Sequence, residues 1–150
     1  MKTTMLILLA LTLLGGVLMV GCQSGPEREP LRAIDRPIQL ERFMGDWYVL
    51  AHIPAPGETE AHNGVESYAL KPDGSIATTY AFRDGGFDGK LEVMQPNAVI
   101  WDETTNATWG MQFFWPLRFE YLVTWLDQDY QTVIIARTRR DYAWVMARKP

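Results

Sequence analysis

The sequence predicts an all-β protein, an eight-stranded antiparallel up-and-down β-barrel. From residue 45 onward, stretches of aromatic and β-branched residues alternate with short turns rich in Gly, Pro, Asp and Asn. Eight such stretches follow one another, and their connections leave no room for the crossover helices that parallel strands require. The first stretch, residues 45–53, is apolar on both faces, as expected for a strand in a barrel with a lined interior and a partly covered exterior. Eight antiparallel strands in sequence order can enclose one small ligand.

The composition excludes several classes of protein. The chain has 150 residues and a formal net charge of −4, which argues against general affinity for nucleic acid. Its only cysteine is Cys22, so an intrachain disulfide is not possible. We therefore expect a single domain of ordinary size, without disulfides and without a nucleic-acid partner.

Residues 1–21 predict a bacterial lipoprotein signal peptide. Lys2 precedes an apolar run, residues 5–20, that is short for a membrane-spanning helix. The run ends in Leu-Met-Val-Gly-Cys, which resembles the lipobox of bacterial lipoproteins. This resemblance implies that Cys22 is the lipid anchor, with palmitate expected as an acyl chain, and Gln23 in place of Asp implies the outer membrane. An uncleaved membrane anchor or an ordinary secretory signal remain the alternatives.

Two segments connect the cysteine to the first strand. Residues 22–36 are rich in proline and charged residues, and we expect a tether between the lipid and the domain. Residues 37–44 carry apolar side chains at 38, 40, 43 and 44, a spacing that predicts a short helical turn beneath one end of the barrel. The barrel domain is thus expected to span residues 37–150.

The remaining strands follow from the turns that bound them. The Lys-Pro-Asp-Gly turn at residues 71–74 predicts a hairpin, since its glycine can take a positive φ. Residues 96–106 have no regular pattern and are expected to form a longer connection. The strands after the first are expected at residues 65–70, 75–82, 88–94, 108–114, 118–126, 130–136 and 142–148.

Three blocks of sequence carry a family resemblance. Gly45-Asp46-Trp47-Tyr48 contains a G-x-W opening, residues 126–130 contain an acidic turn, and residues 140–148 end in Arg148. In this order and spacing, the blocks resemble those of the lipocalins, and specifically of the bacterial outer-membrane lipocalins related to apolipoprotein D. The resemblance covers about residues 37–150.

The resemblance implies that Gly45, Trp47 and Arg148 close one end of the barrel. A guanidinium stacked on an indole fills the opening and keeps its N–H donors free for carbonyl groups. Lipocalins of this group continue into a helix that packs outside the barrel, whereas this sequence stops at Pro150. Either the sequence is truncated or this barrel lacks the helix. Without the helix, an uncovered apolar patch at Tyr48 and Leu50 would favour a homodimer or membrane contact.

Strand alternation identifies candidate ligand contacts inside the barrel. Alternation places every second residue of a strand on the inner face. Core packing in a filled barrel is the alternative interpretation of the same residues. The candidate ligand-binding residues are Val49, Ala51, Tyr121, Val123, Tyr142 and Trp144.

The loops opposite Trp47 are expected to form the mouth of the barrel. They lie at residues 54–63, 83–87, 114–118 and 137–141, and they are rich in arginine. Clustered arginines at an apolar opening suit an acidic or phosphate head group, although charged residues also favour turns in general and the first loop contributes Glu58 and Glu60. The candidate head-group contacts are Arg83, Arg118, Arg139 and Arg140, with Arg137 nearby.

No catalytic or metal-binding pattern stands out. The sequence lacks a G-x-S-x-G elbow, an H-E-x-x-H pair and a phosphate-binding loop. His52 and His62 would need further ligands to hold a metal, and only Glu58 and Glu60 are near them in sequence. We therefore expect no metal, no cofactor and no enzymatic activity.

The leading hypothesis is a lipid-anchored, periplasm-facing lipocalin of the bacterial envelope. It would bind a fatty acid or a lysophospholipid for storage, scavenging or transport. One alternative is an envelope structural or interaction lipoprotein whose barrel is filled. Another is a small enzyme that acts on a bound lipid.

Overall fold

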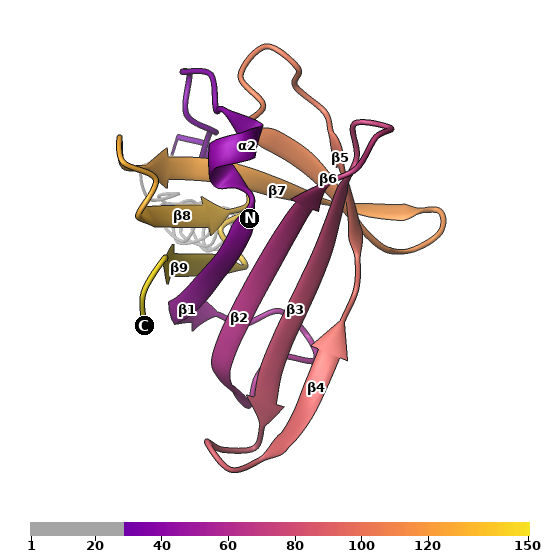
Figure 1. Cartoon of the computed structure of the whole chain (residues 1–150), viewed down its shortest axis with the longest axis vertical. Helices are drawn as coiled ribbons and strands as arrows, with labels where there is room; N and C mark the ends of the chain where they lie inside the picture. The colour runs from indigo at the N-terminus through magenta and orange to yellow at the C-terminus, as the bar shows by residue number, and fades with distance from the viewer. Residues whose placement is uncertain (1–28) are drawn as a thin grey trace, which may run out of the picture.

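The computed structural model describes residues 29–150, which form a closed eight-stranded antiparallel β-barrel (Figure 1). The fold class predicted from the sequence is confirmed. The proposed signal peptide (residues 1–21), Cys22 and the first part of the tether lie outside the described residues. Within residues 29–150, no helix has the length and hydrophobicity that a membrane-spanning helix requires.

Nine strand segments build the barrel, and a short helix, α2 (Leu40–Phe43), precedes them. Every pairing is antiparallel, and the pairing of β2 with β3 closes the ring. The segments are β1 (Gly45–Ile53), β2 (Ala61–Leu70), β3 (Ile76–Asp84), β4 (Lys90–Met94), β5 (Asn97–Ile100), β6 (Thr108–Phe114), β7 (Leu117–Leu126), β8 (Thr132–Ala136) and β9 (Ala143–Ala147).

β4 and β5 are two parts of one barrel strand. Both pair with β3, through Tyr80↔Met94 for β4 and Ile76↔Ala98 for β5. The expectation of an irregular connection at residues 96–106 is therefore wrong for its first residues. Pro96 cannot donate to a sheet ladder, and it separates from β4 a strand of only four residues that the sequence pattern does not resolve.

The two halves of this strand have different neighbours. β5 pairs with β6 as well as with β3, whereas β4 pairs with β3 alone in the part of the chain that the structure describes. The barrel is therefore hydrogen-bonded all round near α2. Toward the opposite end, one edge of β4 is unpaired.

An aromatic cluster closes the end of the barrel next to α2. Phe43, carried by α2, packs with its ring centroid 5.1 Å from Trp47 and 5.2 Å from Trp109, and all three side chains are fully buried. The Trp47 indole N–H donates to the carbonyl oxygen of Phe43 at 2.9 Å. Tyr68 adds a fourth ring, 5.6 Å from Trp109. We refer to Phe43, Trp47, Tyr68 and Trp109 as the aromatic plug.

Arg148 covers the outer side of this plug. Its guanidinium carbon lies 3.8 Å from the centroid of the Trp47 ring, and its Nη1 and Nη2 atoms donate to the carbonyl oxygens of Asp46, Phe43 and Met44 at 2.8–2.9 Å. Gly45 has a φ of +90°, which a residue with a Cβ rarely adopts, and an added Cβ would lie 3.4 Å from Arg148 Nη1. The structure thus places the three predicted barrel-closing residues together.

The segment before α2 packs on the barrel. The Ile34 N–H donates to the carbonyl oxygen of Val123 at 2.9 Å, and the Arg36 guanidinium donates to that of Leu126 at 2.5 Å. Ile38 is buried, and Ala33 and Ile34 pack against the core. The predicted tether extends to Arg36, but from Ala33 onward the chain belongs to the folded domain.

A β-bulge in β1 reverses the alternation that the sequence suggests. The register with β9 shifts between Val49, opposite Met146, and Ala51, opposite Val145. Val49 packs against the core, whereas Ala51 is exposed. The expectation that Ala51 faces the interior is therefore not met, because one extra residue moves all later side chains to the other face.

Candidate functional site

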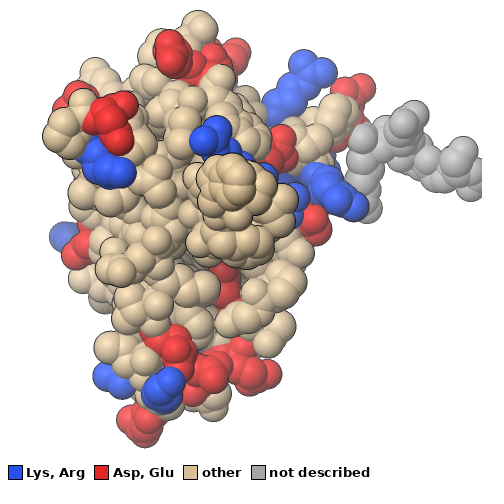
Figure 2. Space-filling view, turned by 90° about the vertical axis from the view of Figure 1, so that its right-hand side faces the viewer, with Lys and Arg blue, Asp and Glu red and all other residues tan. Residues whose placement is uncertain are grey.

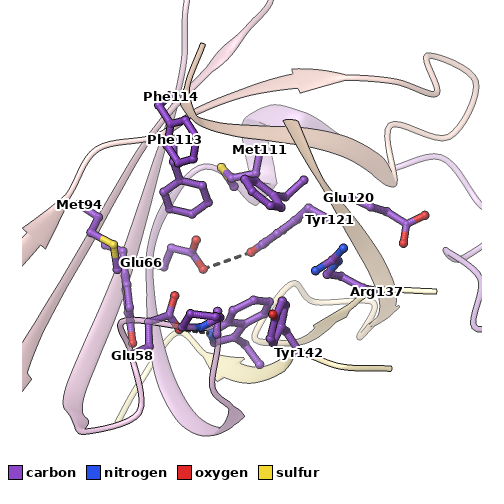
Figure 3. Close-up of a pocket in the computed structure, with 15 residues that line it drawn as sticks. Glu58, Glu66, Met94, Met111, Phe113, Phe114, Glu120, Tyr121, Arg137 and Tyr142 are labelled. Carbon is purple, nitrogen blue, oxygen red and sulfur yellow. Dashed lines mark hydrogen bonds between the residues drawn. The ribbon is translucent and has the colours of Figure 1, made fainter. Parts of the chain in front are cut away.

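A cavity of about 480 Å³ lies inside the barrel (Figure 3). Its volume is within the range of small-molecule pockets, and most of its wall is apolar. Residues from β2, β3, β4, β6, β7 and β9 and from the loops after β1 and β8 form this wall. The apolar and aromatic part consists of Ala55, Pro56, Met94, Met111, Phe113, Phe114, Phe119, Tyr121, Tyr142 and Trp144.

The inner end of the cavity carries a buried carboxyl group. The Tyr121 hydroxyl donates to Glu66 Oε2 at 3.1 Å (Figure 3). The hydroxyls of Tyr121 and Tyr68 are hydrogen-bonded to each other. Burial raises the pKa of Glu66 to about 7, although the hydrogen bonds from the two tyrosines favour its ionised form and act in the opposite direction. Since Tyr68 belongs to the aromatic plug, Glu66 lies at the floor of the cavity.

A second carboxyl group comes from the loop that connects β1 to β2. Glu58 is only 5% exposed, and its Oε2 accepts a hydrogen bond from the Trp144 indole N–H at 3.2 Å. Burial raises the pKa of Glu58, while the hydrogen bond from Trp144 and the nearby His52 lower it. The loop therefore folds into the barrel and brings a carboxyl group with it.

Tyr80 on β3 contributes a polar group without a partner. Its side chain is 5% exposed and lines the cavity, and its hydroxyl makes no hydrogen bond within residues 29–150. Burial raises the pKa of this hydroxyl, and the charges of Glu58 and Glu66 raise it further. Glu58, Glu66 and Tyr80 therefore interact electrostatically across the cavity.

Comparison with known proteins agrees with this geometry. The family model of the Lipocalin-like domain matches residues 38–150, which is most of the chain. The protein belongs to the lipocalin family. The predicted family is thereby confirmed.

Two curated relatives are similar in sequence to this lipocalin. Temperature-induced lipocalin-1 of Arabidopsis thaliana is 29% identical over 122 residues, which cover 74% of this chain and 63% of the relative. The chain thus spans less than two thirds of the length of that protein. The outer membrane lipoprotein Blc of Vibrio cholerae is 24% identical over 143 residues, which cover 92% of this chain and 79% of the relative.

Solved structures show the same fold at lower sequence identity. Insecticyanin from the tobacco hornworm Manduca sexta matches with a TM-score of 0.60 and 16% identity, over 83% of this chain and 68% of that protein. The major allergen Per a 4 from cockroaches matches with a TM-score of 0.57 and 18% identity, over 81% of this chain and 77% of that protein. At these identities the likeness shows the lipocalin fold alone.

The candidate ligand contacts of this lipocalin fall into two groups. Tyr121, Tyr142 and Trp144 line the cavity. Val123 is fully buried in the core, and Val49 lines a separate pocket beside Tyr48 and Leu50. Alternation along β7 and β9 was thus a better guide to the cavity wall than alternation along β1.

The candidate head-group arginines lie outside the cavity. Arg83, Arg118, Arg139 and Arg140 are exposed, and none of them lines the cavity. Arg83 donates to the carbonyl oxygen of Gly89 at 3.3 Å, and Arg140 donates to that of Glu29 at 2.8 Å. The cavity wall of this lipocalin contains Arg137 in their place.

Arg137 is the arginine of the cavity wall, and it already has partners. Its Nη1 lies 3.4 Å from Asp141 Oδ2, and its guanidinium carbon lies 5.0 Å from the centroid of the Tyr142 ring. Glu120, on the same part of the wall, accepts hydrogen bonds from the backbone N–H and the hydroxyl of Thr138. Among the described residues, the charged groups of the wall that lack an oppositely charged partner are therefore carboxyl groups.

Sequence reasoning missed Glu66 and Tyr80, although a signal for both was present. Glu66 alternates with Gly64 and Tyr68 along β2, and Tyr80 alternates with Thr78 and Phe82 along β3, so the alternation rule places both on the inner face. The inward turn of Glu58 had no such signal, because it depends on the conformation of a loop.

Residues 29–150 contain no group of three His, Cys, Asp or Glu side chains placed to hold a metal ion. His52 Nε2 lies 3.4 Å from the carbonyl oxygen of Glu58, and His62 packs its ring 5.1 Å from that of Phe87. Each histidine therefore contacts another residue and not the second histidine.

Proposed function

We propose that this lipocalin binds a single-chain amphiphile, in the size class of fatty acids and lysophospholipids, inside the barrel. The observation that carries this proposal is the largely apolar cavity of about 480 Å³. Each methylene group that leaves water for such a cavity contributes about 0.8 kcal/mol of binding free energy, so the acyl chain would supply most of the affinity. The same cavity argues against a filled barrel with a purely structural role.

We place this activity in the bacterial cell envelope, for storage, scavenging or transport of the ligand. The lipobox-like sequence around Cys22 supports an acylated anchor at that residue and a domain that faces the periplasm. Similarity to the Vibrio cholerae protein, whose name states an outer membrane lipoprotein, supports the outer membrane as its location. Binding without turnover remains our expectation for the bound lipid.

The predicted homodimer stays a prediction. Leu50 and Ile53, on the outer side of β1, are 53% and 52% exposed, and they provide an apolar surface that such a dimer would use.

A pair of matched substitutions tests the proposed site. Ala55 lines the cavity, so Ala55→Trp fills it with an indole ring, whereas Ala51→Trp adds the same ring to the outer face of β1. Isothermal titration with dodecanol, which carries no charge, should show saturable binding to the wild type and to Ala51→Trp. Ala55→Trp should weaken this binding by about tenfold or more, which corresponds to about 1.4 kcal/mol.

The thermal unfolding of both variants serves as the control for folding. Equal dodecanol affinity in Ala55→Trp and wild type, with equal melting temperatures, would show that the ligand binds elsewhere. Loss of binding in Ala51→Trp alone would point to the surface of β1.

A further inference from the structure

The carboxyl groups of the cavity are buried without a counter-ion. Glu66 is hydrogen-bonded to a neutral tyrosine hydroxyl and Glu58 to a neutral indole. Neither of them belongs to an ion pair within residues 29–150, where the pairs join Lys71 to Asp73, Lys90 to Glu92 and Arg137 to Asp141. A buried carboxylate without a cation is costly, so the cavity favours a ligand that supplies one.

The unpartnered hydroxyl of Tyr80 is a second, independent sign of a polar ligand. A hydroxyl that is buried in a wall of the cavity and lacks a hydrogen bond can accept one from a bound molecule. A primary ammonium group carries three N–H donors, which match the carboxylates of Glu66 and Glu58 and the oxygen of Tyr80. A carboxylate head group would instead place a third negative charge beside the two glutamates.

The apolar part of the cavity lies on the other side of these groups. Glu66 and Tyr121 rest on the aromatic plug through Tyr68, whereas Phe113 and Phe114 are 44% and 59% exposed at the opening. Figure 3 shows Glu66 facing Tyr121 across the pocket, with Phe113 and Phe114 at its edge. Figure 2 shows the side toward which the β6–β7 hairpin projects as mainly uncharged, with acidic atoms visible near its middle.

We infer that the cavity selects a single-chain amphiphile with a primary ammonium head group, which binds at Glu66 and Glu58 with its chain directed toward Phe113 and Phe114. This inference rests on the proposed function, since it names the class of amphiphile that the same cavity takes. In this orientation the head group lies inside the cavity and the chain points toward the opening. The sequence predicted the opposite orientation, with the head group held by arginines at the mouth.

The pH dependence of binding has a definite sign. Burial raises the pKa of Glu66 to about 7, so below this pH an ammonium group must displace a proton from the carboxyl group. The affinity for an amine should therefore rise with pH, by up to about tenfold per unit below pH 7, and binding should release a proton. The groups that face Glu66 are Tyr68, Tyr80, Tyr121 and Glu58, and Arg137 and Glu120 complete the charged part of the wall.

The test compares three ligands with the same chain length, namely dodecylamine, dodecanol and lauric acid, by isothermal titration at a pH of about 8. The wild type should bind dodecylamine about tenfold more tightly than dodecanol, and lauric acid more weakly than dodecanol. Glu66→Gln keeps the shape of the side chain and should reduce the ratio of dodecylamine affinity to dodecanol affinity about tenfold. Glu58→Gln should act in the same direction, and it serves as the second variant if Glu66→Gln unfolds.

Glu60→Gln is the matched control, since it removes one exposed carboxylate from the loop that carries Glu58. It should leave the preference for the amine unchanged. Equal binding of the three ligands, or tighter binding of lauric acid, would overturn the inference and leave the proposed function intact. If none of the three ligands binds, the proposed function fails together with it.

Discussion

Glu66 couples the stability of the barrel to pH. Its pKa rises from the ordinary value of 4.5 to about 7 in the folded protein, so between these pH values the folded state binds more protons than the unfolded state. A group with a raised acidic pKa therefore makes the folded state less stable as the pH increases through this window. The shift corresponds to about 3 kcal/mol of unfolding free energy, lost progressively between about pH 4.5 and pH 7.

We expect Glu66→Gln to remove the part of this dependence that comes from Glu66, while Glu58, whose pKa burial also raises, continues to contribute in both proteins. Urea unfolding at several pH values should show the wild type losing up to about 3 kcal/mol relative to the variant between about pH 5 and pH 8. Asp73 and Asp102 do not interfere, because their pKa values are lowered and they titrate below this window. Glu60→Gln should follow the wild-type curve. Parallel curves for the wild type and Glu66→Gln would mean that Glu66 is not buried as described.

Single residues differ in how far the sequence could predict them. Gly45, Trp47 and Arg148 come from blocks of sequence in a fixed order, and the structure brings them together at one end of the barrel. The sequence carries no comparable signal for the conformation of the loop that turns Glu58 inward. Its burial results from a contact with Trp144, which lies 86 positions away along the chain.

At the scale of strands, bulges limit what alternation can predict. The rule holds for Tyr121 on β7, for Trp144 on β9 and for Tyr142 just before β9, all of which reach the cavity. It fails in β1 after the register shift at Val49 and Ala51, because the extra residue has no signature in a strand that is apolar on both faces. The division of one barrel strand into β4 and β5 was hidden for a related reason, since each part is too short to show a period.

The contact between β2 and β3 predicts an effect of Gly64→Ala. A Cβ at Gly64 would lie 2.8 Å from the Tyr80 hydroxyl oxygen and 2.9 Å from Tyr80 Cε2, so the ring must move. We expect a cost of about 1–3 kcal/mol in unfolding free energy and weaker dodecanol binding, because the displaced ring narrows the cavity. Chemical unfolding and isothermal titration measure the two effects.

A double-mutant cycle with Tyr80→Leu tests the mechanism. Leucine lacks the atoms that the new Cβ would meet, so Gly64→Ala should cost less in that background. If the changes in unfolding free energy caused by Gly64→Ala and Tyr80→Leu are additive, the cost of Gly64→Ala comes from the backbone of β2 and not from contact with Tyr80.

At the scale of the whole molecule, the folded domain begins before the strands. Ile34 and Arg36 bind backbone carbonyl groups of β7, and Ala33 and Ile34 pack on the core. A chain that begins at Pro37 should therefore be less stable than one that begins at Glu29, by about 1–2 kcal/mol, since it loses these hydrogen bonds and the burial of Ile34. Urea unfolding of the two chains measures this difference. Equal midpoints and slopes would show that the segment adds nothing to the stability of the barrel.

The overall architecture was predictable because it depends on repeated features. Turn residues and runs of β-forming residues recur along the whole chain, so one misplaced boundary does not change the number of barrel strands. The contacts of Ala33, Ile34 and Arg36 with the barrel were not predictable, for the opposite reason. Ala33 and Ile34 lie between Arg32 and Asp35 in a segment without a regular apolar pattern, and only the folded barrel supplies the surface that they cover.

The unpaired edge of β4 has a consequence for aggregation. An exposed strand edge offers free N–H and C=O groups to any other extended chain, and Leu91 and Val93 on this strand are 52% and 50% exposed. Strand addition at this edge requires no unfolding of the barrel, so the native state itself is the species at risk in concentrated samples. Lys90 and Glu92, joined by an ion pair of 2.6 Å, place charges on the same short strand and oppose such growth.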